Sequence, residues 1–313
     1  SVEGQLWYNS ASNVWKTSAS GGGAWAASGS MNSPTMTGGV YIGTTTVGIY
    51  AGGIPGDVTT TQTYNGSIWA ASPATLNTGR HYLTNTGLGT STAGQIMGGE
   101  VPVAVSPTYV VAVSEQFDGS TWTEVGDLTS SRIAIIGAGT QTAALAITGG
   151  AGDSPPDGSV LVESWDGTSW TAATATNDQR TYAMGGGTQT SALAAGGIIY
   201  PTILDSSETW NGTNWTEQVV MNTGREVGGR GVASDSSGII FGGNYPGVTY
   251  SNLAEVWNGS TWTEVGDMAT ARGAIGSDGT ATAAIAAGGA PPNTGLTEAW
   301  NDPVYSVKTV TTS

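Results

Sequence analysis

The chain contains no cysteine, and His81 is the single histidine among its 313 residues. Without cysteine it cannot form a disulfide, a thiolate nucleophile or a zinc–thiolate site. One histidine is too few for the usual copper or zinc centres, and no Gly-x-Ser-x-Gly motif accompanies it to build a catalytic triad. We therefore predict that His81 is a structural or surface residue, and that the protein is not an enzyme and holds no cofactor or metal ion. The enzymatic alternative left open is a glycan-cleaving pair of carboxylates, because any two of the 23 acidic residues could meet in the fold.

Basic residues are also scarce. Lys and Arg number 8 against 23 Asp and Glu, which gives a formal net charge of −15. Because like charges repel, neither nucleic acid nor an anionic membrane surface is expected as a partner. No apolar run approaches the ~18 residues that a membrane-spanning helix needs, so no membrane insertion is predicted either.

Turn-forming and aromatic residues are abundant instead. The chain has 50 Gly and 12 Pro, too many for a helical protein, together with 12 Trp and 11 Tyr, which disordered chains lack. Short strands joined by tight turns fit this composition best.

The chain repeats itself. The phrase "ETWNGTNWT" at Glu208–Thr216 recurs as "ESWDGTSWT" at Glu163–Thr171 and "EVWNGSTWT" at Glu255–Thr263. Each copy follows a Gly-Gly pair that ends a short apolar run. The first aromatic residue of the phrase is found at Tyr64, Phe117, Trp165, Trp210, Trp257 and Trp300, and the second at Trp25, Trp69, Trp122, Trp170, Trp215 and Trp262. The intervals are those of propeller blades.

One repeat contains four strand patterns. In the last copy, "RGAIGSDG", "TAAIAAGG" and "LTEAW" read as three strands, and in earlier copies Asn-Gly or Asp-Gly then turns the chain into a fourth strand that begins at the second Trp. We expect a two-residue type I′ turn centred on Asn-Gly, with both tryptophans and Glu208 on one sheet face. Two buried Trp per unit need a neighbouring sheet to cover them. The sequence therefore predicts an all-β fold, a six-bladed β-propeller of four-stranded antiparallel blades.

The repeat also predicts how the ring closes. Trp25 opens a fourth strand that has no partners before it, whereas Trp300 lies on a third strand that no Trp-bearing fourth strand follows. We expect the strand at Trp25 to complete the last blade. The predicted organisation is a hairpin or linker in residues 1–20, the propeller in residues 21–302 and a C-terminal extension in residues 303–313.

These repeats resemble kelch-type β-propellers. The shared pattern is the Gly-Gly pair after the second strand, the aromatic residue in the third, the Trp in the fourth and an Arg that enters the next first strand, here at Arg80, Arg132, Arg180, Arg225 and Arg272. Two features depart from the family: the third-strand aromatic is often Trp, and the first repeat has no Arg ("MNSPTMTGG"). The resemblance implies an architecture and no particular activity.

A second resemblance covers the N-terminal segment. "EGQLWYNSASNVWK" at Glu3–Lys16 is similar to short segments of bacteriophage tail-fibre and other virion proteins, and the repeats themselves resemble kelch arrays encoded by marine phages. The resemblance implies a virion protein whose N-terminal segment attaches it to other virion proteins. Trp7, Tyr8 and Trp15 are too apolar for a free tail, so we expect them to pack against something.

Five repeats carry a Glu two residues before the third-strand aromatic, and five carry the repeat Arg. We expect these residues to form structural Arg–carboxylate pairs within the same or an adjacent blade. The alternative is a ring of Arg that binds an anion at the axis. The five acidic residues are Glu115, Glu163, Glu208, Glu255 and Glu298.

The segments after the Gly-Gly pairs differ most between repeats. Since strands alternate in direction, these segments and the connections between blades should emerge together at one end of the disc. They contain Tyr109, Tyr200, Tyr245 and Tyr250, which we predict to be ligand contacts; covering the blade tops is the structural alternative. Asp153 and Asp157 in one such loop could contribute to a Ca²⁺ site, although a solvated loop is the simpler interpretation.

Together these features predict a non-enzymatic binding module at the virion surface or another extracellular location. Its expected partner is a host surface glycan or protein receptor, and the acidic charge favours a neutral glycan over an acidic one. The alternative is a cellular kelch-type adaptor or surface-adhesion domain that mediates protein–protein interaction.

Overall fold

The computed structural model describes most of the chain. The described residues are 6–9, 14–19, 23–33, 37–55, 59–83, 87–101, 109–151, 157–247, 249–302 and 306–310. The side chains of residues 6–9, 14–19, 151, 157 and 306–310 are not described. All regular secondary structure in these ranges is β-strand, so they include no helix long and apolar enough to cross a membrane.

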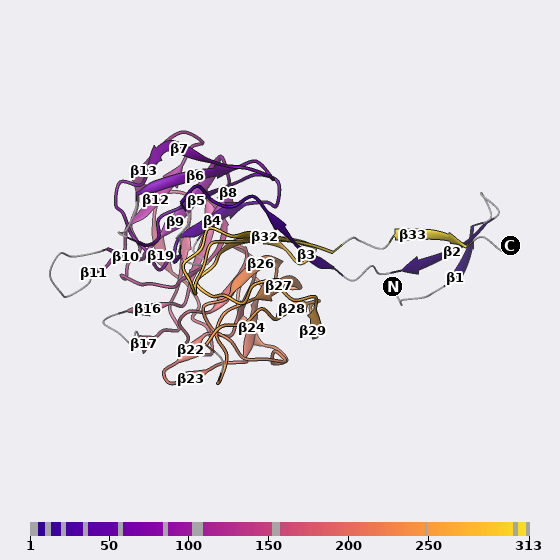
Figure 1. Ribbon diagram of the computed structural model, residues 1–313. Coiled ribbons are helices and arrows are strands. Elements are labelled where there is room, and N and C mark those ends of the chain that lie inside the picture. Colours follow the sequence, from indigo (N-terminus) through magenta and orange to yellow (C-terminus); the bar gives the residue numbers. More distant parts are fainter. Residues whose placement is uncertain are drawn as a thin grey trace.

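Six four-stranded antiparallel sheets form a ring (Figure 1). The blades are, in chain order, β4 (Val40–Gly43), β5 (Gly48–Ala51), β6 (Thr60–Tyr64) and β7 (Trp69–Thr75); β8 (Leu88–Thr90), β9 (Ala93–Met97), β12 (Ser114–Phe117) and β13 (Trp122–Val125); β14 (Ile136–Thr140), β15 (Ala143–Ile147), β18 (Val162–Trp165) and β19 (Trp170–Ala172); β20 (Met184–Thr188), β21 (Ser191–Ala195), β24 (Ser207–Trp210) and β25 (Trp215–Glu217); β26 (Gly229–Ser234), β27 (Ser237–Phe241), β28 (Ala254–Trp257) and β29 (Trp262–Val265); β30 (Gly276–Thr280), β31 (Ala283–Ala287), β32 (Thr297–Asn301) and β3 (Ala24–Ser28). The first strand of each blade contacts the first strands of both neighbours, and the contact between β30 and β4 completes the circle. The predicted six-bladed propeller is confirmed.

The N-terminal strand closes the last blade as predicted. Strand β3 pairs antiparallel with β32 and places Trp25 opposite Trp300, with ring centroids 5.8 Å apart. Trp25 also meets the ring of Phe241 in blade 5 edge-on at 4.6 Å. The closing strand is therefore packed against its own blade and against the neighbouring one.

The outer hairpin differs from its prediction. Trp210 pairs directly with Trp215, so the strands are joined by the four residues Asn211–Asn214 and not by a two-residue Asn-Gly loop. Only Gly212 has a positive φ, 92°, whereas a type I′ turn needs two such residues. Asn211 instead accepts the backbone N–H groups of Thr213 and Asn214 through its Oδ1, at 3.0 and 2.9 Å. The type I′ prediction was wrong, because the Asn211 side chain organises a longer, four-residue connection.

The corrected register places the two tryptophans of the hairpins in blades 3, 4 and 5 directly opposite each other, with their rings tilted by 37–41°. Their ring centroids lie 5.4 Å apart for Trp210 and Trp215, and 5.3 Å apart for the equivalent pairs in blades 3 and 5. Both rings are buried between blades. The two tryptophans therefore lie on one sheet face, as predicted. Most of the core is found at the junctions between blades.

Five of the six fourth-strand Trp residues donate their indole N–H to the preceding blade. In four junctions the acceptor is a hydroxyl at the start of the third strand, as in the bond from Trp262 Nε1 to Ser207 Oγ. Val162 stands at that position in blade 3, and Trp215 donates to the carbonyl of Thr174 instead. Ala254 stands there in blade 5, and the buried Nε1 of Trp25 has no hydrogen-bond partner among the described residues.

A small sheet lies outside the ring. Strands β1 (Leu6–Asn9) and β2 (Val14–Ala19) form a hairpin, and β33 (Ser306–Val310) pairs with β2 on its other side. The N-terminal segment is thus a hairpin separate from the blades, and part of the C-terminal extension belongs to the same sheet. The expected packing of Trp7, Tyr8 and Trp15 lies outside the described side chains.

The unsatisfied indole of the closing strand leads to a first prediction. Ala254→Ser places a hydroxyl where the equivalent positions of four blades already hold one. We expect the free energy of unfolding to rise by about 1 kcal/mol, the usual net contribution of one hydrogen bond, in urea titration. Ser207→Ala is the matched control and should lower stability by about 1–3 kcal/mol, because it leaves Trp262 Nε1 without its acceptor. An Ala254→Ser protein no more stable than the wild type would contradict this account of the junction.

Candidate functional site

The two ends of the disc differ in character. We call the end that carries the connections between second and third strands, and between blades, the loop end, and the opposite end the turn end. In three consecutive blades the loop-end connections form small ribbons: β10 (Glu100–Val101) with β11 (Tyr109–Val110), β16 (Gly150–Ala151) with β17 (Asp157–Gly158), and β22 (Ile198–Ile199) with β23 (Thr202–Ile203). Figure 1 shows these ribbons on the left and the terminal sheet on the right. The chain ends and the variable loops therefore lie at opposite ends of the molecule.

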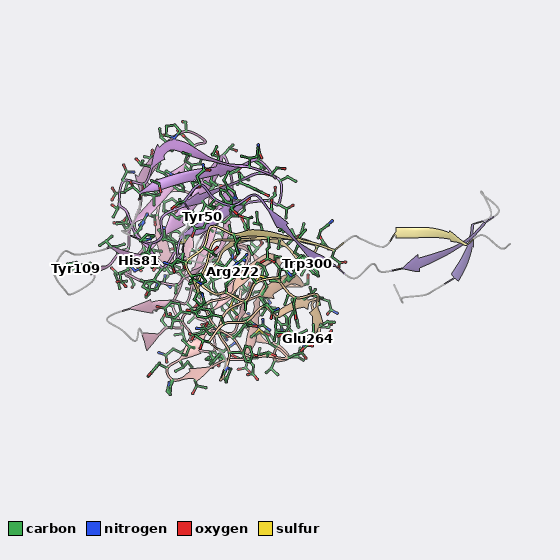
Figure 2. The ribbon with its side chains drawn as sticks, in the orientation of Figure 1. Tyr50, His81, Tyr109, Glu264, Arg272 and Trp300 are labelled. Atoms are coloured by element: carbon green, nitrogen blue, oxygen red, sulfur yellow. The ribbon has the colours of Figure 1, made fainter. Side chains whose placement is uncertain are left out.

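The structure separates the four predicted contact tyrosines into two pairs. Tyr109 is 57% exposed on β11 and Tyr200 is 66% exposed directly after β22. Figure 2 shows Tyr109 at the tip of the loop end. Tyr245 and Tyr250 are half-buried, and the Tyr250 ring lies against the backbone of Gly273. Tyr109 and Tyr200 are available for binding, whereas Tyr250 covers the top of a blade.

Exposed apolar side chains are concentrated at the loop end. Nine large hydrophobic residues are exposed in the described part of the chain, and two of them, Val47 and Ile68, lie at the turn end. The other seven belong to loop-end connections: Tyr109, Leu161, Ile199, Tyr200, Val219, Val220 and Leu296. Seven of the nine exposed hydrophobic residues in the described part of the chain therefore lie at the end that carries the variable connections.

The mouth of the central channel contains tyrosines that the sequence reasoning missed. The residue two positions after each repeat Arg has a positive φ of 50–56°, and it is Tyr in blades 2 and 4 but Ala or Val in the others. Tyr82 and Tyr182 meet edge-on with their ring centroids 5.9 Å apart. Burial raises the pKa of both phenols, and the nearby carboxylate of Glu100 adds to the rise. Comparing this one position between repeats would have identified them.

Backbone hydrogen bonds join these positive-φ residues around the channel. Ala134 donates its N–H to the carbonyl of Tyr82, and Val227 donates to Tyr182. The series continues from Ala274 to Val227 and from Gly38 to Ala274. The positive-φ conformation thus recurs in every blade that has the repeat Arg, whereas tyrosine occupies the position in only two of them.

All five expected Arg–Glu pairs are present, each within one blade. In the second blade, Arg80 Nη2 donates to Glu115 Oε1 at 2.9 Å, while its Nη1 donates to the carbonyl of Val113 at 2.6 Å. The other Glu115 oxygen accepts the N–H of Asn77 in the connection that enters the blade. The remaining pairs are Arg132–Glu163 at 2.7 Å, Arg180–Glu208 at 2.8 Å, Arg225–Glu255 at 2.5 Å and Arg272–Glu298 at 2.7 Å. All five guanidinium groups are buried, which supports the structural interpretation over an anion-binding ring.

The first blade keeps the same hydrogen-bond arrangement without the charged pair. It lacks the repeat Arg, and Gln62 stands where the other blades have Glu. The Gln62 amide oxygen accepts the N–H of Asn32 at 2.9 Å, as the carboxylates do elsewhere. At this position of the third strand, a carboxylate is thus present only in the blades whose repeat Arg neutralises it.

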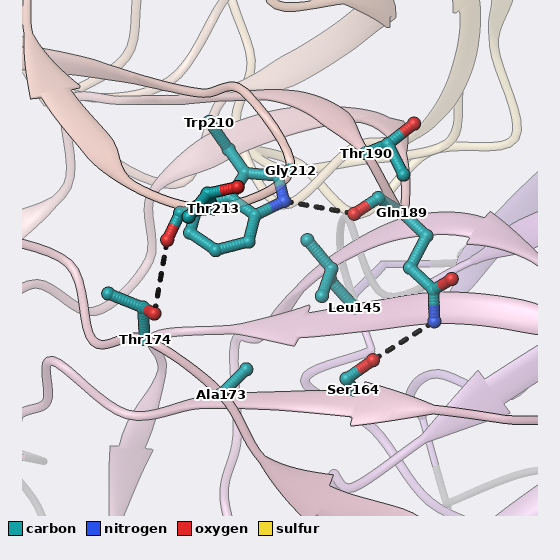
Figure 3. Close-up of a pocket in the computed structure, with 9 residues that line it drawn as sticks. All are labelled: Leu145, Ser164, Ala173, Thr174, Gln189, Thr190, Trp210, Gly212 and Thr213. Atoms are coloured by element: carbon teal, nitrogen blue, oxygen red, sulfur yellow. Dashed lines mark hydrogen bonds between the residues drawn. The ribbon is translucent and has the colours of Figure 1, made fainter.

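A cleft separates blades 3 and 4 (Figure 3). It has a volume of about 390 Å³ and a floor of Leu145 and Trp210. Its remaining walls are small or neutral polar residues: Ser164, Ala173, Thr174, Gln189, Thr190, Gly212 and Thr213. Gln189 Nε2 donates to Ser164 Oγ at 3.0 Å, and Thr174 Oγ1 donates to the carbonyl of Thr213 at 3.2 Å. Among the described residues, no charged side chain lines the cleft.

The described residues contain no group of three or more side chains that could hold a metal ion. Asp153 and the side chain of Asp157, the residues considered for Ca²⁺, lie outside the described part. His81 is half-buried at the loop end, with its Nε2 3.8 Å from Glu100 Oε1.

The buried pairs lead to a second prediction. Glu255→Gln leaves Arg225 as a buried cation without its carboxylate, so the free energy of unfolding should fall by about 3–5 kcal/mol. Glu264→Gln, at an exposed position opposite Glu255 in the same hairpin, is the matched control and should stay within about 0.5 kcal/mol of the wild type. Equal stability of the two variants in urea titration would show that the pair is not needed.

Comparison with known proteins supports the fold alone. No protein-family model matches the chain, and no curated protein matches it. A solved structure titled "Structure of YjhT" matches with a TM-score of 0.71 and 14% sequence identity, covering 89% of this chain and 99% of that one. In all, 202 chains of solved structures match, so the architecture is too widely shared to specify an activity. The chain is similar to YjhT in fold, and this fold is consistent with a binding or protein-interaction module.

Proposed function

We propose that the protein is a non-enzymatic binding module of a virion, and that its loop end recognises a neutral glycan or a protein receptor on the host surface. The observation that supports this most is the bias of exposed apolar and aromatic side chains to the loop end. Tyr109 and Tyr200 offer large contact areas with few rotatable bonds, and the blades beneath them hold the loops without much ordering cost.

The opposite placement of the chain ends supports the role of an appendage. Strand β3 begins at Ala24 and β32 ends at Asn301, so both ends of the chain leave blade 6 at the turn end. A module attached there to other virion proteins would direct its loop end away from the particle. The tail-fibre-like segment Glu3–Lys16 and the kelch-like repeats support the same assignment.

The second candidate is a cellular kelch-type adaptor or adhesion domain, which the same loop end would serve equally well. The genes beside the coding sequence distinguish the two: tail or baseplate genes support the virion role, and a cellular operon supports the adaptor. Detection of the protein in purified virions by mass spectrometry is the direct test.

A third prediction concerns the loop end. Tyr109→Ala with Tyr200→Ala should weaken attachment of the labelled protein to host cells, or to its best ligand on a glycan array, by at least about tenfold, or about 1.4 kcal/mol. The thermal midpoint should not change, because both side chains are exposed. Ile68→Ala removes a 65% exposed apolar side chain at the turn end and is the matched control. If the double variant attaches as well as the wild type and has the same thermal midpoint, the receptor site does not include these two tyrosines.

A further inference from the structure

Arg230 is the only arginine of the chain outside the repeat set. It is the second residue of β26, whereas the second residues of β14, β20 and β30 are Gly137, Gly185 and Ser277. Its side chain is only 3% exposed. Burying a cation is strongly unfavourable unless opposite charge and hydrogen bonds compensate for the lost water. The repeat does not account for Arg230, so its contacts need an explanation of their own.

The Arg230 side chain crosses the central channel. Its Nη2 donates to the carbonyl of Gly87 at 2.7 Å. Gly87 lies directly before β8 in blade 2, and blade 2 is opposite blade 5 in a ring of six. A Cβ atom at Gly186 in blade 4 would collide with Arg230 Nη1, so glycine at that position leaves room for the guanidinium group. One side chain therefore joins two opposite blades.

Asp278 of blade 6 extends this connection to blade 1. Its Oδ1 lies 3.9 Å from Arg230 Nη1, and its Oδ2 accepts the N–H of Gly43 in blade 1 at 3.0 Å. The backbone N–H of Arg230 also donates to Ser277 Oγ in blade 6 at 2.8 Å. Burial raises the pKa of the Asp278 carboxyl and lowers the pKa of the Arg230 guanidinium, and the opposite charge counteracts each shift. The pair thus links blade 5 to both blades of the closing junction.

Little space remains beside this pair. A cavity of about 110 Å³ is lined by residues of blades 2 to 6, including Leu88, Gly139, Gly187 and Val232, so it lies on the axis of the ring. Small-molecule sites typically measure ~300–1,000 Å³. At the level of Arg230 the channel is therefore too narrow for such a ligand, and a molecule bound at the loop end would not pass through the ring.

We propose that Arg230 and Asp278 form an axial tie, which holds the inner strands of the ring together across the channel. Strand β3 closes the ring at the outer edge of blade 6, whereas the axial tie joins blade 5 to blades 6, 1 and 2 from the inside. Blades 1 and 2 are not adjacent to blade 5, so the axial tie connects parts of the ring that the blade junctions do not connect directly. This inference concerns the ring itself and does not depend on the receptor site proposed above.

Hydrogen exchange measured by mass spectrometry tests the proposal, because it reports local opening strand by strand. The first variant is Arg230→Met, which keeps most of the length of the side chain and removes its charge and hydrogen bonds. The second combines Arg230→Met with Asp278→Asn, so that no unpaired carboxylate is left in the channel and folding is less endangered. Val232→Ala is the matched control, since it removes apolar contacts from the same strand and the same cavity but leaves the axial tie in place.

The comparison uses the inner strands β4, β8 and β14. Blades 1, 2 and 3 are all non-adjacent to blade 5, and the axial tie reaches only the first two of them. We expect both Arg230 variants to lower the protection of β4 and β8 by at least about tenfold more than that of β14. In Val232→Ala the three strands should lose protection equally or not at all. Equal loss in β4, β8 and β14 of the Arg230 variants, a selective loss that disappears in the double variant, or the same selective loss in Val232→Ala would each overturn the proposal.

Discussion

The fold depends on the buried pair between an Arg at the entrance of a blade and a Glu on its third strand, which is present in five of the six blades. One guanidinium joins the carboxylate to carbonyls at the blade edge, and the same carboxylate accepts the N–H groups of the connection that enters the blade. Burying either charge alone would be strongly unfavourable. The exchange of Glu for Gln62 in the blade without the Arg shows that the hydrogen-bond geometry is required in every blade, while the charge is required only where it is neutralised.

Stability that comes from such regular contacts leaves the loop end free to vary. The aromatic pairs of the outer hairpins and the indole bonds to preceding blades repeat around the ring with few exceptions. The loop-end connections contribute little to these contacts, so they can differ in length and carry exposed residues such as Tyr109 and Tyr200. The molecule thereby combines a rigid ring with one variable surface.

Much of this could be predicted because the sequence repeats. Glu208 and Arg180 recur at fixed positions, and both the pairing and the closure by Trp25 follow from counting the repeats. The turn register could not be predicted in the same way, because Asn211 can be either the first residue of a two-residue loop or the first residue of a four-residue loop that its side chain organises, and both fit the letters "NG". The cleft was missed for another reason: its walls come from two blades, and no comparison within one repeat shows that Ala173 leaves space beside Trp210.

The closing blade also decides how the molecule would carry mechanical force. Ala24 and Asn301 are paired neighbours on β3 and β32, so tension applied through the two chain ends enters the ring at a single blade. A pull between the chain ends and a receptor at the loop end runs along these two strands, and the hydrogen bonds of the strands bear it together instead of opening one after another. Blade 6 is thus the element on which the tensile strength of an attached molecule would depend.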